Sequence, residues 1–145
     1  MHYIYVKELK RNIPLFLDAG DITIKLYKDD RAATEISGSE AHEQYTAFTD
    51  ASNEYNSKMR EMYYLFKEAE GIAGNEKEAD SLEKAMDDIY EEQQEFIKQY
   101  LRENNSDEFV TSPYIAQRNS YSWSVEEMEE IVNGFSENLK QADEY

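Results

Sequence analysis

The stretch EGIAGNE, from Glu70 to Glu76, separates two long helical patterns and so decides the fold. Apolar and aromatic residues before it recur at steps of three and four, at Tyr45, Phe48, Ser52, Tyr55, Met59, Met62, Phe66 and Ala69. The same spacing after it links Ala79, Leu82, Met86, Ile89, Gln93, Phe96 and Tyr100. This spacing is typical of one face of an amphipathic helix. Because the glycine-containing loop is short, the two helices are predicted to form an antiparallel hairpin over residues 40–104.

Capping residues predict where these two helices begin. Ser39 follows Gly38 directly and is expected to be the N-cap of the first helix. Asn75 and Glu78 are expected to form a capping pair at the start of the second.

Two shorter helices are predicted after the hairpin. Ser112 can cap a helix over residues 112–121 with Pro113 at its first position, and the alternative is a helix that starts near Asp107 and kinks at Pro113. The Ser-Val-Glu-Glu capping box that begins at Ser124 predicts a fourth helix over residues 125–140. Its inner face is expected to comprise Met128, Ile131, Val132, Phe135 and Leu139.

Residues 1–38 have the period-two pattern of short strands. Apolar runs lie at residues 3–6, 13–17, 22–26 and 33–36, and Gly20 is expected to form the tight turn between the second and third runs. One face of the third run, with Ile22, Ile24 and Leu26, is expected to be buried. Pro14 lacks an N–H, so its strand is expected at a sheet edge. Exposed edges also favour pairing between copies, and a homodimer is therefore expected.

The predicted fold class is α+β and mostly α. Short antiparallel strands form a partial sheet over residues 1–38, and a four-helix region built on the long hairpin forms a helical domain over residues 39–145. The chain has 145 residues, which suits a core of ordinary size.

Composition narrows the classes of function. The 32 acidic and 15 basic residues give a formal net charge of −17, which disfavours binding to nucleic acid. An acidic mimic of nucleic acid is a minor alternative. The absence of cysteine excludes disulfides and thiolate catalysis within this chain. No stretch is apolar enough for a membrane span, and the N-terminal residues lack the apolar core of a signal peptide.

Few residues of the sequence suggest a catalytic or metal-binding role. Carboxylate pairs such as Glu91-Glu92 and Glu126-Glu127 are expected on solvated faces, and His42 is expected at the surface rather than as a metal ligand. We therefore expect no catalytic residue, metal or cofactor. Tyr114, Tyr121 and Trp123 gather at a helix-to-helix corner, where they either pack under the bundle or form an exposed interaction patch.

Two phrases of the sequence carry a family resemblance. The first contains FLDAGDITI and ISGSEAHEQYTAF, and the second contains FIKQYLRENN and SVEEM. Together they resemble the N-terminal accessory region of envelope thioredoxin-like proteins of the AhpC/TSA and thiol:disulfide oxidoreductase type, which begins with a domain of unknown function. The matching residues are Phe16, Leu17, Gly20, Ile22, Thr23, Ile24, Ser37, Gly38, Ser39, Tyr45, Phe48, Phe96, Ile97, Leu101, Asn104, Ser112 and Ser124 to Met128.

The resemblance implies a noncatalytic accessory module in the periplasm or cell envelope. Its partner would be a thioredoxin-like domain or the protein substrate of that domain, and such proteins carry a lipoprotein signal and a Cys-x-x-Cys domain that this chain lacks. The resemblance therefore predicts that the reading frame continues into such a domain after Tyr145.

Two alternatives remain beside that hypothesis. The first is a self-contained acidic helical module that binds a protein partner through its acidic face or through the corner at Tyr114, Tyr121 and Trp123. The second is an acidic hydrolase, which would require two partly buried carboxylates that face one cleft.

Overall fold

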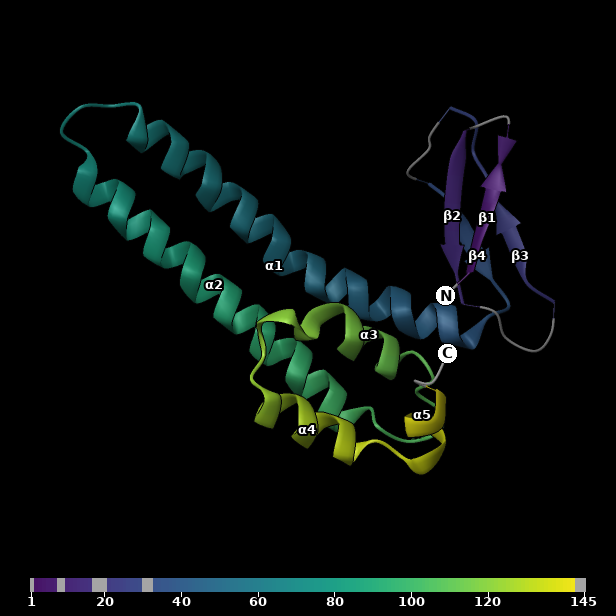
Figure 1. The fold of residues 1–145 in the computed structure, drawn as a ribbon. Helices are drawn as coiled ribbons and strands as arrows, with labels where there is room; N and C mark the ends of the chain where they lie inside the picture. The colour runs from purple at the N-terminus through teal and green to yellow at the C-terminus, as the bar shows by residue number, and fades with distance from the viewer. Residues whose placement is uncertain (1, 8–9, 17–20, 30–32, 143–145) are drawn as a thin grey trace. The chain divides into compact units, whose positions relative to one another are not determined.

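The computed structural model describes residues 2–7, 10–16, 21–29 and 33–142 (Figure 1). It is mostly helical, with two short antiparallel strand pairs at the N-terminus and two long helices, which confirms the predicted fold class. The elements are β1 (His2–Val6), β2 (Arg11–Leu15), β3 (Thr23–Lys25), β4 (Glu35–Ser37), α1 (Glu40–Glu70), α2 (Glu76–Glu103), α3 (Ser112–Asn119), the 3-10 turn η2 (Ser120–Ser122), α4 (Val125–Gly134) and α5 (Glu137–Ala142).

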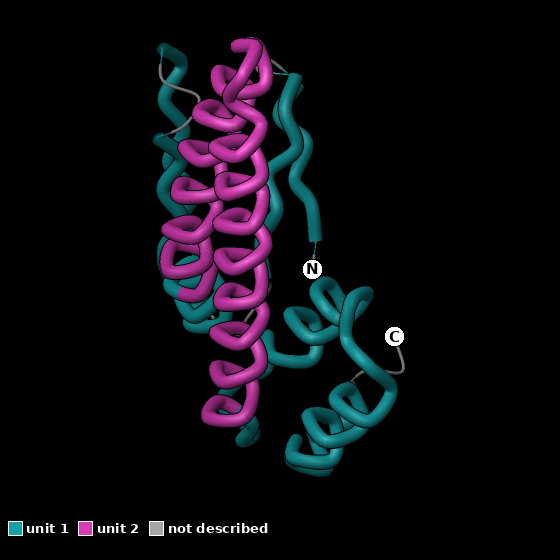
Figure 2. The backbone as a smooth tube through the Cα atoms, turned by 90° about the vertical axis from the view of Figure 1, so that its left-hand side faces the viewer, with its two compact units in different colours: residues 1–47, 105–145 teal, residues 48–104 magenta. Residues whose placement is uncertain are grey.

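The chain packs as two compact units (Figure 2). One unit contains residues 48–104, which comprise most of α1 and all of α2. The other contains residues 1–47 and 105–145, so the strands share a unit with the first turns of α1 and with the C-terminal helices.

Within the unit of residues 48–104, α1 and α2 form the predicted antiparallel hairpin. The Phe48 ring lies 4.9 Å from the Tyr100 ring, and the amide of Gln93 donates to the Ser52 hydroxyl at 3.1 Å. Every predicted seam residue of this unit is buried or half-buried. In the connecting loop Gly74 has a φ of 94°, a conformation that suits glycine.

Two details of the hairpin differ from the sequence predictions. Asn75 is the N-cap residue of α2, but its side chain makes no capping hydrogen bond, so the predicted capping pair with Glu78 is wrong. The last turns of α2 also have a second buried face beside the predicted seam, which the spacing did not reveal. This second face consists of Gln94, Ile97, Lys98 and Leu101.

The strands pair differently from the prediction. β1 pairs with β2 through Ile4 opposite Ile13, and β3 pairs with β4 through Ile24 opposite Ile36. The predicted hairpin between the runs at 13–17 and 22–26 is therefore wrong, because the first run pairs with β1 and the second pairs with β4. The predicted turn at Gly20 lies outside the described residues. Ile22 and Ile24 are half-buried and Leu26 is exposed, so the face expected to be buried is only partly covered.

The junction between β4 and α1 depends on Gly38 and Ser39. Gly38 has a φ of 88°, and a Cβ at this position would collide with the backbone carbonyl of Asp21, so only glycine fits. Ser39 is 1% exposed. Its hydroxyl donates to the Phe16 carbonyl at 2.8 Å and accepts from the backbone N–H of His42 at 3.1 Å, which confirms Ser39 as the N-cap of α1.

Three aromatic rings join β2, α1 and α3 in this unit. The Phe16 ring lies 4.9 Å from the Tyr45 ring and 5.3 Å from the Tyr114 ring, and the two tyrosine rings are 5.8 Å apart. Tyr45 was predicted to lie on the seam of the hairpin, but its ring packs in this cluster instead. The end of β2 therefore has an aromatic anchor to both helices.

The C-terminal helices differ from the prediction in number and in their bounds. The cap of α3 is Thr111 rather than Ser112, and the helix ends at Asn119 with η2 after it, so no kinked helix starts near Asp107. The Ser124 capping box is confirmed, with the Glu127 N–H donating to the Ser124 hydroxyl and the Ser124 N–H donating to the Glu127 carboxylate. The predicted helix over 125–140 is two helices, because the backbone is extended at Phe135.

Ser39→Ala is expected to lower the free energy of unfolding by about 2 kcal/mol. The substitution removes the cap of α1 and leaves the Phe16 carbonyl without this donor in a buried position. Urea denaturation followed by circular dichroism measures the change. Ser57→Ala, on the exposed face of α1, is the matched control and should leave stability unchanged or slightly raised. Equal stability of the two variants would contradict the assigned role of Ser39.

Candidate functional site

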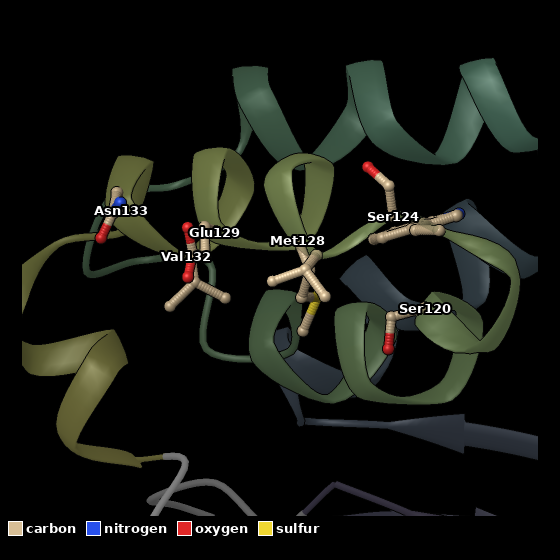
Figure 3. Close-up of a pocket in the computed structure, with 8 residues that line it drawn as sticks. Ser120, Ser124, Met128, Glu129, Val132 and Asn133 are labelled. Carbon is tan, nitrogen blue, oxygen red and sulfur yellow. The ribbon is translucent and has the colours of Figure 1, made fainter.

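The candidate site is a cavity of about 380 Å³ formed by η2, the following turn and α4, which we call the Trp123 cavity (Figure 3). Its apolar lining comes from Trp123, Val125, Met128 and Val132. Its polar lining comes from Ser120, Ser124, Glu129 and Asn133. All of these residues belong to one short segment, residues 120–133, of the same compact unit.

The helical spacing of α4 explains why the cavity exists. Val125, Met128 and Val132 recur at steps of three and four, so their side chains share one face of the helix. Ile131, on the adjacent face of α4, is buried, and so is Phe135 directly after the helix. The apolar surface of α4 is therefore wider than the core can cover. The uncovered part lines the cavity, and Val125 remains 70% exposed.

The charged residues of α4, the helix that lines the cavity, have one sign. Helix α4 carries Glu126, Glu127, Glu129 and Glu130 and has no basic residue. Glu127 belongs to the capping box, whereas Glu129 lines the cavity itself. An apolar side chain with a lysine or arginine beside it would match this surface, because carboxylates at the rim attract cations.

The three aromatic residues singled out in the sequence have three different environments. Tyr114 is half-buried and packs against Phe16 and Tyr45, as expected if it lies under the bundle. Tyr121 is 80% exposed. Of the three, only Trp123 is among the residues that line the cavity.

The sequence signal for this site lay in α4 rather than in the tyrosines. Met128 and Val132 were predicted on the inner face, and they line the cavity with Trp123 instead of lying in the closed core. Val125 was not singled out. The excess width of the apolar stripe on α4 was the signal that could have identified it.

His42 was predicted to lie at the surface, but it is partly covered. Its side chain is half-buried, and its Nδ1 is inaccessible and has no hydrogen-bond partner among the described residues. Burial lowers the pKa of His42, and the nearby Glu43 carboxylate opposes that shift. The described residues contain no cluster of three His, Asp or Glu side chains placed to hold a metal ion.

Two further cavities lie on the helical hairpin. One, of about 280 Å³, lies near the loop and includes Phe66 and Ala79. The other, of about 410 Å³, includes Tyr55, Phe96 and Tyr100. The carboxylates that line all three cavities are exposed, an arrangement that does not favour an acid–base pair with separated pKa values. None of the described helices has both the length and the hydropathy of a membrane span.

Comparisons with known proteins identify no family for this chain. A scan against protein-family models found no matching family, and searches of curated proteins and of solved structures found no match.

The contribution of His42 to stability is expected to decrease on acidification through its titration range. The pKa of His42 is lowered in the folded state, so the unfolded chain takes up a proton first as the pH falls below about 6.5. Above that pH this contribution to stability is fully present. It is lost as the pH falls toward the pKa of His42 in the folded state.

Chemical denaturation of the wild type and of His42→Gln between about pH 7.5 and pH 5.5 tests this expectation, because the variant should lose less stability over this range. His2→Gln, at an exposed position, is the matched control. A histidine pKa above about 6.5 for His42 by NMR would contradict the predicted direction.

Proposed function

We propose that this chain is a noncatalytic protein-binding module whose Trp123 cavity accepts an apolar side chain of a basic partner segment. The observation that carries the proposal is an open apolar cavity on a helix whose charged residues are all acidic. Exposed apolar surface bordered by polar residues is typical of contact sites. A tryptophan in such a pocket is also the kind of residue that contributes most to binding energy.

The partner would insert a side chain such as leucine or methionine beside Trp123 and Met128. Burial of one such side chain contributes about 1.5–3 kcal/mol. Lysine or arginine next to the inserted residue would lie near Glu129 and its neighbours on α4. Binding should therefore weaken as salt is added, since exposed charges are screened.

The resemblance suggests a more specific setting, which stays a prediction. In that setting the chain is the accessory region of an envelope thiol:disulfide oxidoreductase, and the basic segment belongs to a thioredoxin-like domain or to its substrate. Both hypotheses, the accessory region and the self-contained interaction module, use the same cavity. They differ in the identity of the partner. A homodimer also stays a prediction.

Trp123 is the only tryptophan of the chain, so its fluorescence reports on the cavity directly. A short peptide with one leucine flanked by lysines is expected to shift this fluorescence in a saturable manner at low salt. Met128→Lys is expected to weaken binding at least about tenfold, because it removes apolar contact and introduces a cation that repels the peptide.

Val110→Lys is the matched control for that experiment. Val110 is exposed and does not line the cavity, so the same change in charge there should affect binding only slightly. An equal loss in both variants, or a peptide with glutamates in place of lysines that binds as well, would overturn the proposed site.

The purified chain is expected not to accelerate the reduction of insulin disulfides by dithiothreitol. Thiol–disulfide exchange requires a thiolate, and the chain contains no cysteine. Turbidity of precipitating insulin measures the rate, with thioredoxin as the positive control. Turnover by this chain would refute the noncatalytic assignment.

A further inference from the structure

The third cavity is an aromatic groove along one side of the helical hairpin, and it lies wholly within the unit of residues 48–104. Its floor consists of Tyr55 from α1 and of Phe96 and Tyr100 from α2. The rings of Tyr55 and Phe96 are 5.6 Å apart. We call this surface the hairpin groove; the magenta helices of Figure 2 carry it.

An acidic stripe borders the hairpin groove on its α2 side. Glu92, Glu95, Gln99 and Glu103 line the groove and recur at steps of three and four, so they form a row along the helix. The row extends over about 16 Å, given a rise of about 1.5 Å per residue. All four side chains are exposed.

The contacts of these side chains leave most of the negative charge available. Glu95 pairs with the buried Lys98 at 3.1 Å, and Glu103 accepts a hydrogen bond from Gln99 at 2.7 Å. Glu92 forms no ion pair with another described residue. On α1, Lys58 lies 5.4 Å from the centre of the Tyr55 ring, so this aromatic side chain already makes a cation–π contact.

We propose that the hairpin groove binds a basic amphipathic helix of a partner protein. The apolar face of that helix would cover Tyr55, Phe96 and Tyr100. Lysines or arginines at matching steps of three and four would lie along the stripe on α2. This is the helix-in-groove mode of recognition, in which apolar anchors supply contact and charges set orientation. Lys58, next to Tyr55 on α1, favours the orientation that keeps the basic row on α2.

Charge argues against a second copy of this chain as the occupant. Residues 48–104 contain 15 acidic and 7 basic side chains, so two hairpins that approach through this surface repel each other. A helix of opposite charge has no such penalty. The site also lies apart from the Trp123 cavity in the sequence, and it does not depend on the function proposed for that cavity.

The test uses the full chain and a fluorescein-labelled peptide helix in which leucines form one face and lysines recur along its edge. Fluorescence anisotropy at low salt measures the affinity. The double variant Glu92→Gln/Glu103→Gln is expected to weaken binding about fivefold, and Gln99→Glu is expected to tighten it about twofold, in keeping with the modest strength of exposed charge pairs.

Two controls separate a specific groove from general attraction between opposite charges. Glu61→Gln/Glu68→Gln makes the same change in net charge at exposed positions of α1 that do not line the groove, and it should alter the affinity less than twofold. A peptide of the same composition with scrambled lysines should bind more weakly and should not distinguish the two double variants. Circular dichroism verifies that all variants retain the helical fold.

Two results would overturn the proposal. Equal weakening by the two double variants would show that only net charge matters. A dimer in sedimentation experiments that the substitutions Glu92→Gln and Glu103→Gln strengthen would identify a second copy as the occupant instead.

Discussion

The unit that contains the candidate site depends on Phe16, the residue directly after β2. Its ring contacts Tyr45 of α1 and Tyr114 of α3, and its carbonyl accepts the hydroxyl hydrogen of Ser39. One residue thus links a strand, the start of the longest helix and a helix distant in the sequence. The burial of three aromatic surfaces at one point supplies apolar contact that a pair of two-stranded sheets lacks by itself. Because α3 continues through η2 toward Trp123, this anchor also holds the segment that forms one wall of the cavity.

The helical hairpin could be predicted because its determinants are local. Apolar residues at steps of three and four identify the buried face of a helix. A short loop requires two long helices to run antiparallel. The same reasoning identified Ser39 and the Ser124 capping box, since a cap needs only residues within one turn. Prediction failed at Asn75, where a side chain suited to capping makes no such bond. It also missed the second buried face of α2, because two of the buried residues, Gln94 and Lys98, are polar.

Strand pairing and the candidate site were less accessible to prediction. Period-two patterns show that strands exist but not which strands pair, so the run at 13–17 was assigned to the wrong partner. The aromatic corner was predicted as one cluster, yet the half-buried Tyr114 packs against Phe16 while Trp123 lines the cavity. Both surfaces proposed for binding share one physical feature. Each combines uncovered apolar side chains with carboxylates on the helix that lines it, so a partner with apolar and basic side chains matches both surfaces.

The sequence by itself determined the fold class, the hairpin, the caps at Ser39 and Ser124, and the acidic character. It also determined where charge resides, because residues 1–38 contain six acidic and six basic side chains while the rest of the chain carries the whole excess. These properties follow from composition and from contacts within one or two turns. Tertiary structure alone decided which apolar residues remain uncovered. Whether Met128 or Tyr55 faces a closed core or an open cavity depends on neighbours from other elements, and no local pattern specifies them.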